Sequence, residues 1–112
     1  MKTYRYVAAP TFWRNFKKLP RKQWTSVRAC WDIFKLDPFD ARLGTHKINS
    51  LSAILGRTVY AVVVECDLSI TFYIDGNTIV TTNIGTHAIY RTYRLFLFRL
   101  SKTNPLFAKT SS

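Results

Sequence analysis

The chain has 112 residues and a formal net charge of +11 at pH 7, because 17 Lys and Arg outnumber six Asp and Glu. This length predicts one domain that buries roughly two thirds of its unfolded surface. So large an excess of positive charge predicts a polyanionic partner, with nucleic acid first. An acidic protein that masks the same surface is compatible with this charge. A membrane surface is a weaker alternative, since the basic residues are spread along the chain.

The cysteines and the N-terminus bear on the compartment. Cys30 lies in an apolar helix-like segment and Cys66 in a strand-like one, so we expect free, buried thiols rather than a disulfide. The N-terminus lacks the apolar core of a signal peptide, and no stretch approaches the ~18 apolar residues that span a bilayer. We therefore expect a soluble, cytoplasmic protein with no membrane partner.

The first third of the chain predicts a strand and then two helices. Residues 3–8 alternate and are rich in β-formers, which favours a strand. Pro10 suits the first turn of a helix that Pro20 then ends. From Arg21 to about Leu36, apolar residues recur at steps of three and four and form one stripe. The stripe consists of Trp24, Val27, Trp31 and Phe34. We expect the tryptophans of this region to be core residues rather than stacking platforms for bases.

Basic residues occupy the other sides of these two helices. They are Arg14, Lys17, Lys18, Arg21, Lys22 and Arg28. One interpretation is a solvated helical face, which needs no partner. The other is a clamp on phosphates or on an acidic protein. The sequence leaves both interpretations open.

The second half predicts a long connection followed by antiparallel strands. Residues 36–56 break the helical pattern with proline and glycine, and we expect an ordered connection that carries His46 and Lys47. Residues 58–65 are apolar on both faces, which is typical of a central strand. Residues 68–74 alternate, "DGN" predicts a hairpin turn, and residues 78–84 return antiparallel.

The alternation within residues 68–74 assigns side chains to two faces of the sheet. Leu68, Ile70, Phe72 and Ile74 point one way, and Ser69, Thr71 and Tyr73 point the other. The helices should cover the apolar face because their stripe needs a partner, which leaves the other face partly open. The expected fold class is α+β, with an N-terminal strand and a helical hairpin packed on a twisted antiparallel sheet. We expect one domain over residues 1–104 and a disordered tail over 105–112.

The residue types restrict the possible chemistry. Histidines, cysteines and carboxylates show no metal-ligand spacing, and neither a nucleotide-binding glycine loop nor a serine-hydrolase motif occurs. We therefore expect no cofactor and no metal. RNA supplies its own nucleophile, the 2′-hydroxyl, so a ribonuclease needs a proton acceptor, a proton donor and cations around the phosphorane. Histidine, tyrosine, lysine and arginine meet these needs.

The stretch "NIGTHAIYR" holds one of the two histidines. His87 is a candidate proton-transfer group, because histidine titrates near neutral pH. The same letters also fit a helix start with Thr86 as its N-cap. His46 is the second candidate, and the adjacent Lys47 is placed to reach a phosphate from an ordered loop beside the open face.

Three patterns in the chain resemble the RelE/ParE toxin superfamily, in particular the RelE-like ribonuclease toxins of bacterial toxin–antitoxin modules. They are "FWRNFKKLP", "DPFDARLGTHKI" and "DLSITFYIDGNTIVTTNIGTHAIYR", and the resemblance covers about residues 8 to 91. The resemblance implies a ribosome-dependent, metal-independent mRNA endoribonuclease that inhibits translation. The open sheet face would receive mRNA in the ribosomal A site. A cognate antitoxin, expected to be small and acidic, would neutralise the toxin in a hetero-oligomer.

The resemblance also implies roles for single residues. His87 would serve as general acid or base and Tyr90 would lie near the reacting nucleotide, with His46 and Asp67 as further catalytic candidates. The residues expected to hold phosphates are Lys47, Arg57, Arg91, Lys18, Arg21 and Lys22.

Two positions depart from the family pattern. Ser69 stands where many relatives have an arginine, and Ala88 where many have an acidic residue. Loss of one contact that stabilises the phosphorane typically costs ~10²–10³-fold in rate. One alternative is therefore a weakened or inactive homologue that only binds antitoxin or RNA. Another is a ParE-like inhibitor of gyrase, against which the histidine-containing ending argues.

Overall fold

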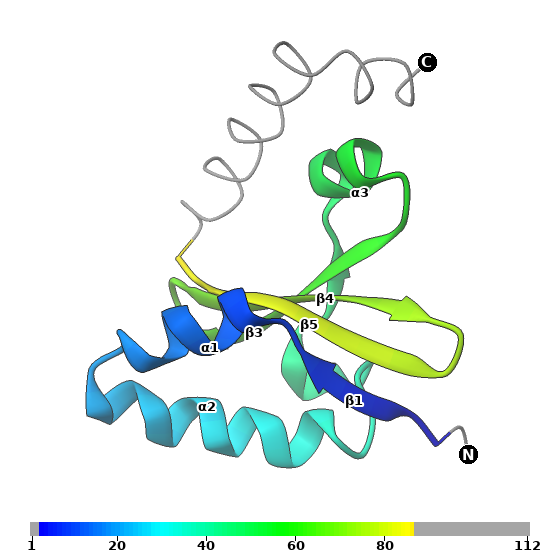
Figure 1. The fold of residues 1–112 in the computed structure, drawn as a ribbon. Coiled ribbons are helices and arrows are strands. Elements are labelled where there is room, and N and C mark those ends of the chain that lie inside the picture. The colour runs from blue at the N-terminus through cyan, green and yellow to red at the C-terminus, as the bar shows by residue number, and fades with distance from the viewer. Residues whose placement is uncertain (1–2, 87–112) are drawn as a thin grey trace, which may run out of the picture.

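The structure, a computed structural model, describes residues 3–86, and the predictions for residues 87–112 lie outside them (Figure 1). The elements in chain order are β1 (Arg5–Ala8), α1 (Pro10–Lys17), α2 (Arg21–Phe34), the 3-10 turn η1 (Ala41–Leu43), β2 (His46–Lys47), α3 (Asn49–Leu55), β3 (Val59–Glu65), β4 (Leu68–Asp75) and β5 (Thr78–Gly85). The expected α+β class is confirmed. No helix within residues 3–86 has the length and apolar character needed to cross a bilayer.

The strands form one sheet in the order β1-β5-β4-β3-β2. Strands β3, β4 and β5 make the antiparallel set that the sequence predicts, and β2 adds to β3 in the same sense. Strand β1 pairs with β5 in parallel, so the sheet is mixed rather than antiparallel throughout. The centre is β4 and not β3, because β1 extends the sheet on the far side of β5. Residues 58–65 form an interior strand as expected, with β4 on one side and β2 on the other.

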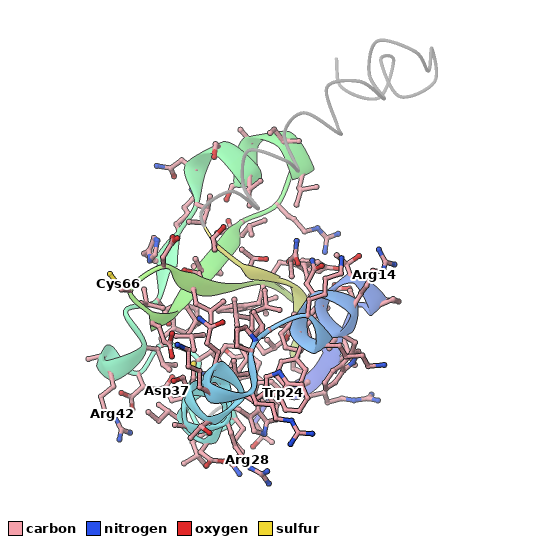
Figure 2. All side chains as sticks on the ribbon, turned by 90° about the vertical axis from the view of Figure 1, so that its left-hand side faces the viewer. Arg14, Trp24, Arg28, Asp37, Arg42 and Cys66 are labelled. Carbon is pink, nitrogen blue, oxygen red and sulfur yellow. The ribbon has the colours of Figure 1, made fainter. Side chains whose placement is uncertain are left out.

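Two prolines set the geometry of the helical hairpin. Pro10 occupies the first turn of α1, where its missing N–H costs no hydrogen bond. Pro20 precedes α2 and cannot continue α1, so the chain turns between the two helices. Figure 2 shows α1 and α2 on one side of the sheet and α3 on the other. The two faces of the sheet therefore have different surroundings.

The core lies between the hairpin and the sheet, as the apolar stripe predicts. Phe34 of α2 contacts Phe72 of β4 edge to face, with ring centroids 5.1 Å apart, and Phe72 is fully buried. The hydroxyl of Tyr6 donates a 2.8 Å hydrogen bond to the carbonyl of Phe34, which satisfies an acceptor at the end of α2. At the other end of this helix, Ser26 and Gln23 donate hydrogen bonds to the carboxylate of Glu65 on β3.

The tryptophans are not core residues, so this expectation is wrong. Trp13, Trp24 and Trp31 are 50%, 36% and 40% exposed. The sheet covers the part of the helical stripe that holds Val27 and Phe34, and the larger indoles lie at its margin. Each still has an aromatic neighbour, as Trp31 shows by packing edge to face on Tyr6 at 5.2 Å.

The connection over residues 36–56 has more structure than the sequence predicts. Asp40 caps η1 by accepting a hydrogen bond from the backbone N–H of Arg42. Hydrogen bonds from the Arg42 side chain and backbone lower the pKa of Asp40 to about 2. Ser52 ties α3 to the sheet, because its hydroxyl accepts a 2.9 Å bond from the N–H of Val59. These elements are too short to produce a periodic pattern.

The two cysteines have different environments, and both are free. Cys30 is buried in α2, which confirms the expectation for it, and burial raises the pKa of its thiol to about 11. Cys66 is exposed in the turn between β3 and β4, so the expectation that it is buried is wrong. The strand that precedes it ends at Glu65, and the thiol falls on the turn instead.

Candidate nucleic-acid interface

The face of the sheet opposite the helical hairpin carries His46, and the strand register explains its position. His46 pairs with Ala61 across β2 and β3, and Ala61 pairs with Thr71 across β3 and β4. Paired residues of neighbouring strands project to the same face, and neighbouring strands lie about 4.8 Å apart. His46 therefore stands at the edge of a row of small side chains. The two-residue strand β2 exists only through this pairing.

A backbone hydrogen bond orients the imidazole of His46. The ring nitrogen Nδ1 lies 2.9 Å from the carbonyl oxygen of Gly44. Because a carbonyl oxygen only accepts, Nδ1 carries the hydrogen, and in the neutral ring Nε2 is the free acceptor. Gly44 adopts a left-handed φ of 59°, which turns its carbonyl toward the ring. The exposed His46 thus presents a proton acceptor on the face away from the helices.

Ser69 lies on the same face but is buried, at 5% exposed. It pairs with Val63 on one side and Gly85 on the other, one row from His46 along the strands. Its neighbour on this face, Thr71, is 3% exposed. The expectation that the face is open at Ser69 is therefore wrong. The face is accessible at its β2 edge, where His46 is exposed. Lys47 is also exposed, but it pairs with Tyr60 and therefore projects to the other face.

A cation lies beside this face at the end of β4 that is farther from Ser69. The guanidinium carbon of Arg57 lies 4.4 Å from the ring centroid of Tyr73. Tyr73 follows Ser69 and Thr71 on the same face of β4, so the row of His46 lies between Ser69 and Tyr73. Stacking on a ring leaves the N–H groups of an arginine free to bind phosphate. Arg57 forms no ion pair with any residue in the range 3–86.

A β-bulge in β5 gives this site a feature that sequence reasoning missed. The register shifts between Thr71 and Phe72, which leaves Thr82 as the extra residue. The hydroxyl of Thr82 lies 2.7 Å from that of Thr71 and donates to the Thr71 carbonyl at 3.1 Å. Next to the bulge, the side-chain amide of Asn15 on α1 donates a 2.6 Å hydrogen bond to the side-chain oxygen of Asn83. The signal in the sequence is the run of three polar residues at 81–83, which breaks the alternation of β5.

The other predicted site residues fall into three groups. Asp67 is exposed in the turn that leads into Ser69. His87, Tyr90 and Arg91 lie outside the described residues. The described part of the chain ends at Thr86, one residue after Gly85, which pairs with Ser69 across β4 and β5. The remaining basic residues are exposed at the connection of α1 and α2, on the side of the sheet away from α3 (Figure 2). They are Lys18, Arg21 and Lys22.

The structure therefore brings together only part of the predicted set. His46 and Arg57 lie on the face away from the hairpin, and Asp67 lies at one end of it. Lys47 is not brought to this face, because its partner Tyr60 stacks on Phe72 on the hairpin side. Lys22 instead lies near Glu65, whose pKa is lowered by the hydrogen bonds from Ser26 and Gln23 and, to a smaller extent, by the charge of Lys22. The molecule thus has two separate basic surfaces.

No protein-family model and no curated protein matches this sequence. Solved structures do match its fold. YafQ from E. coli strain BL21(DE3) has a TM-score of 0.62 and 13% identity over 77% of this chain and 96% of YafQ. The RelB-RelE antitoxin-toxin complex from Methanococcus jannaschii gives 0.60 and 17%, over 78% of this chain and 96% of the matched chain. The archaeal RelE-RelB complex from Pyrococcus horikoshii OT3 gives 0.59 and 14%, over 75% and 94%. The chain has the RelE-like fold.

Proposed function

We propose that this protein is the toxin of a bacterial toxin–antitoxin system and acts in the cytoplasm as a ribosome-dependent, metal-independent mRNA endoribonuclease. The observation that carries the proposal is an oriented, exposed histidine on the face of a RelE-like sheet away from the hairpin, with the stacked Arg57 beside the same face. Two of the matched structures are complexes of RelE with RelB, and one of them is described as an antitoxin-toxin complex. The net charge of +11 also suits a polyanionic substrate.

The proposed reaction uses the substrate's own hydroxyl. A base removes the proton of the 2′-hydroxyl, the 2′-oxygen forms a bond to phosphorus, and the bond from phosphorus to the 5′-oxygen breaks. An acid protonates the leaving 5′-oxygen, so the products are a 2′,3′-cyclic phosphate and a 5′-hydroxyl. In this proposal His46 takes the proton through Nε2, and His87 donates the second proton. No electron transfer and no metal are needed.

The negative charge of the phosphorane needs cations. Arg57 is held near the face of His46 by Tyr73, and Lys47 follows His46 at the exposed β2 edge, although it alternates to the other face. We assign these two side chains to the phosphate groups, since Ser69 carries no charge. A guanidinium that is already stacked loses less freedom when it binds a phosphate than an unrestrained one. The role of Tyr90 near the reacting nucleotide and of Arg91 at a phosphate belongs to the same proposal, and Asp67 is a further candidate at the end of the site.

Induction of the chain in a bacterial host tests the proposal. Expression of the native sequence should arrest growth and stop the incorporation of labelled amino acids within minutes. The double variant His46→Ala/His87→Ala should accumulate to the same level without arrest, because the chain then lacks both proton-transfer groups. A fully toxic double variant would contradict the assignment of the site.

The buried Ser69 favours a second candidate function, that of a disabled toxin that binds its antitoxin or RNA without cleaving. Nothing at this position can supply the cation, since the side chain is small, uncharged and enclosed. The comparison of the native chain with Ser69→Arg separates the candidates. Cleavage only by Ser69→Arg would establish the disabled form, and cleavage by the native chain would exclude it. Because an arginine must displace neighbours at this buried site, the circular dichroism of the variant is the necessary control.

A further inference from the structure

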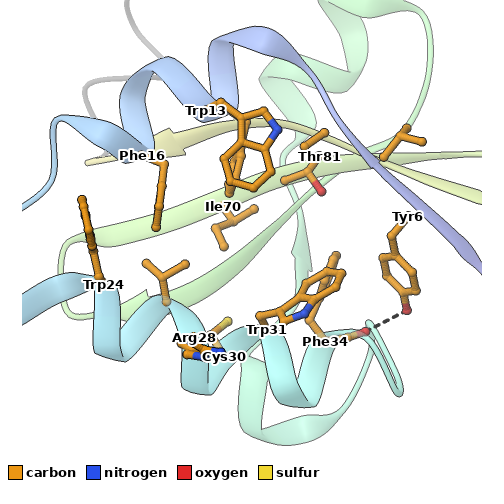
Figure 3. Close-up of a pocket in the computed structure, with 14 residues that line it drawn as sticks. Tyr6, Trp13, Phe16, Trp24, Arg28, Cys30, Trp31, Phe34, Ile70 and Thr81 are labelled. Atoms are coloured by element: carbon orange, nitrogen blue, oxygen red, sulfur yellow. Dashed lines mark hydrogen bonds between the residues drawn. The ribbon is translucent and has the colours of Figure 1, made fainter. Parts of the chain in front are cut away.

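The helix-covered side of the sheet holds an apolar groove (Figure 3). Its volume is about 570 Å³, which lies within the range of about 300–1,000 Å³ that is usual for the sites of small ligands. Side chains of β1, α1, α2 and the middle of the sheet line it, and seven of these 14 residues are aromatic. Aromatic rings pack best against other rings, in offset or edge-to-face arrangements. The lining therefore favours a ligand that is itself a flat ring system.

Contacts between rings hold the two ends of the groove in place. Trp24 stacks on Phe16 at one end, with ring centroids 5.3 Å apart. Trp31 packs edge to face on Tyr6 at the other end, at 5.2 Å. Trp13 lies across the hollow from Trp31 (Figure 3), and these two indoles are 50% and 40% exposed. Part of each indole surface is therefore open to a ring that lies between them.

The groove has a single charged side chain. Among the described residues that line it, only Arg28 carries a charge at pH 7. Arg28 is exposed and forms no ion pair with any residue in the range 3–86. Burial raises the pKa of the Cys30 thiol to about 11 and also raises the pKa of Tyr6, so neither group adds negative charge. The groove is thus suited to a ligand with one anionic group.

Hydrogen-bonding groups are scarce in the groove. Thr81 is 7% exposed, and the hydroxyl of Tyr6 already donates to the carbonyl of Phe34 at 2.8 Å. A nucleobase carries several donors and acceptors, and each one that loses water here without a new partner costs binding energy. A hydrocarbon ring has no such cost. The chemistry of the lining therefore favours a hydrocarbon ring over a base.

Charge disfavours two protein occupants. The segment 87–112 carries five Lys and Arg and no Asp or Glu, so it does not complement Arg28. A second copy of the chain would bring another net charge of +11.

We infer that this groove is a binding site for a small aromatic carboxylate, whose ring lies between Trp13 and Trp31 and whose carboxylate pairs with Arg28. Arg28 and Trp31 are three residues apart on α2, so their side chains are neighbours on the helix surface. A guanidinium can donate two parallel hydrogen bonds to one carboxylate. The groove lies on the side of the sheet away from His46, so this inference does not depend on the proposed RNA cleavage.

Calorimetric titration of the full chain with 2-naphthoate tests the inference. Three control ligands each change one property. The amide 2-naphthamide keeps the rings and lacks the charge, octanoate keeps the carboxylate and lacks the rings, and adenosine monophosphate is an aromatic anion with a polar base. The naphthoate should bind saturably, and each control should bind at least about tenfold more weakly, since a hydrogen-bonded charge or a ring contact is lost.

Variants and spectra locate the site. Arg28→Gln should weaken 2-naphthoate about tenfold and leave 2-naphthamide unchanged, because only the carboxylate loses its partner. Lys22→Gln removes the same charge from the same helix outside the groove, and it should change neither affinity. In the NMR spectrum of the native chain, the indole N–H signals of Trp13 and Trp31 should shift during the titration. Trp13→Leu should weaken binding about tenfold.

Four results would overturn the inference. They are the absence of saturable binding by 2-naphthoate, equal binding of any control ligand, equal effects of Arg28→Gln and Lys22→Gln, and indole signals of Trp13 and Trp31 that do not move. The spectra of the native chain decide the question even if a tryptophan variant fails to fold. Loss of growth arrest with intact naphthoate binding would contradict the proposed function alone.

Discussion

The two faces of the sheet differ in what they leave exposed. The helix-covered face presents an apolar groove that three tryptophans line. The opposite face presents a histidine at its edge and a stacked arginine at one end, while its centre is filled by small buried residues. The first arrangement favours an apolar ligand and the second a phosphate chain.

Among the groups that would bind phosphate, the largest effect is expected from removal of the stacked cation on the histidine face. Arg57→Gln should slow mRNA cleavage ~10²-fold, because one donor to the developing phosphorane charge is lost. Tyr73→Leu should slow it by less, since the arginine remains but is no longer held. Initial rates on ribosome-bound mRNA measure both. Equal rates in the native chain and Arg57→Gln would remove Arg57 from the site and weaken the contrast between the faces.

The stability of the molecule should depend on the helix-covered face. Phe72→Ala leaves a cavity beneath Phe34 and should lower the free energy of unfolding by about 3–5 kcal/mol. Ser69→Ala, on the other side of the same strand, removes only a hydroxyl and should cost about 1 kcal/mol or less. Urea denaturation of the two variants makes the comparison. Equal losses would show that the faces contribute alike.

A carboxylate on β3 links α2 to the sheet in a pH-dependent way. Folding lowers the pKa of Glu65 through hydrogen bonds from Ser26 and Gln23, so its stabilisation is present above the unfolded value of about 4.3. It is lost as the pH falls through the lower folded value. Glu65→Gln should therefore lower the melting temperature at pH 7 and make no difference in strong acid. Ser26→Ala should show the same trend, and a gap that grows in acid would contradict it.

The smallest effect concerns the thiols. One equivalent of a thiol reagent should react at once with the native protein at the exposed Cys66, and a second only after unfolding exposes Cys30. The raised pKa of the buried thiol reinforces this difference, because the thiolate is the reactive form. Cys66→Ser should abolish the fast phase. Two fast equivalents in the native protein would show that the hairpin does not cover the sheet as described.

Periodicity in the sequence located the long elements closely. The second helix was expected from Arg21 to about Leu36 and ends at Phe34, and the strand at residues 68–74 is observed at Leu68–Asp75. Long elements repeat their pattern often enough to be recognised without knowledge of the fold.

The features that the sequence did not reveal depend on contacts between distant segments. Strand β2 has two residues and is defined by its pairing with Tyr60 and Ala61. The burial of Ser69 depends on the neighbouring strands, and the exposure of Trp31 depends on how far the sheet extends beneath α2. The alternation within β4 placed Ser69 on the correct face of the sheet, but it did not indicate how deeply the side chain is buried. The residue types of the candidate site could thus be predicted from the sequence. That these residues lie on two separate surfaces could not.

The central claim is that His46 acts in metal-free cleavage of mRNA on the face away from the helices. Primer extension on a defined mRNA in programmed ribosomes tests it most directly, with the native chain and His46→Ala assayed in the presence of EDTA. The account predicts cleavage in the ribosomal A site that survives EDTA and falls ~10²–10⁴-fold in the variant, the usual contribution of a proton-transfer group. No cleavage by the native chain, or equal cleavage by His46→Ala, would contradict it.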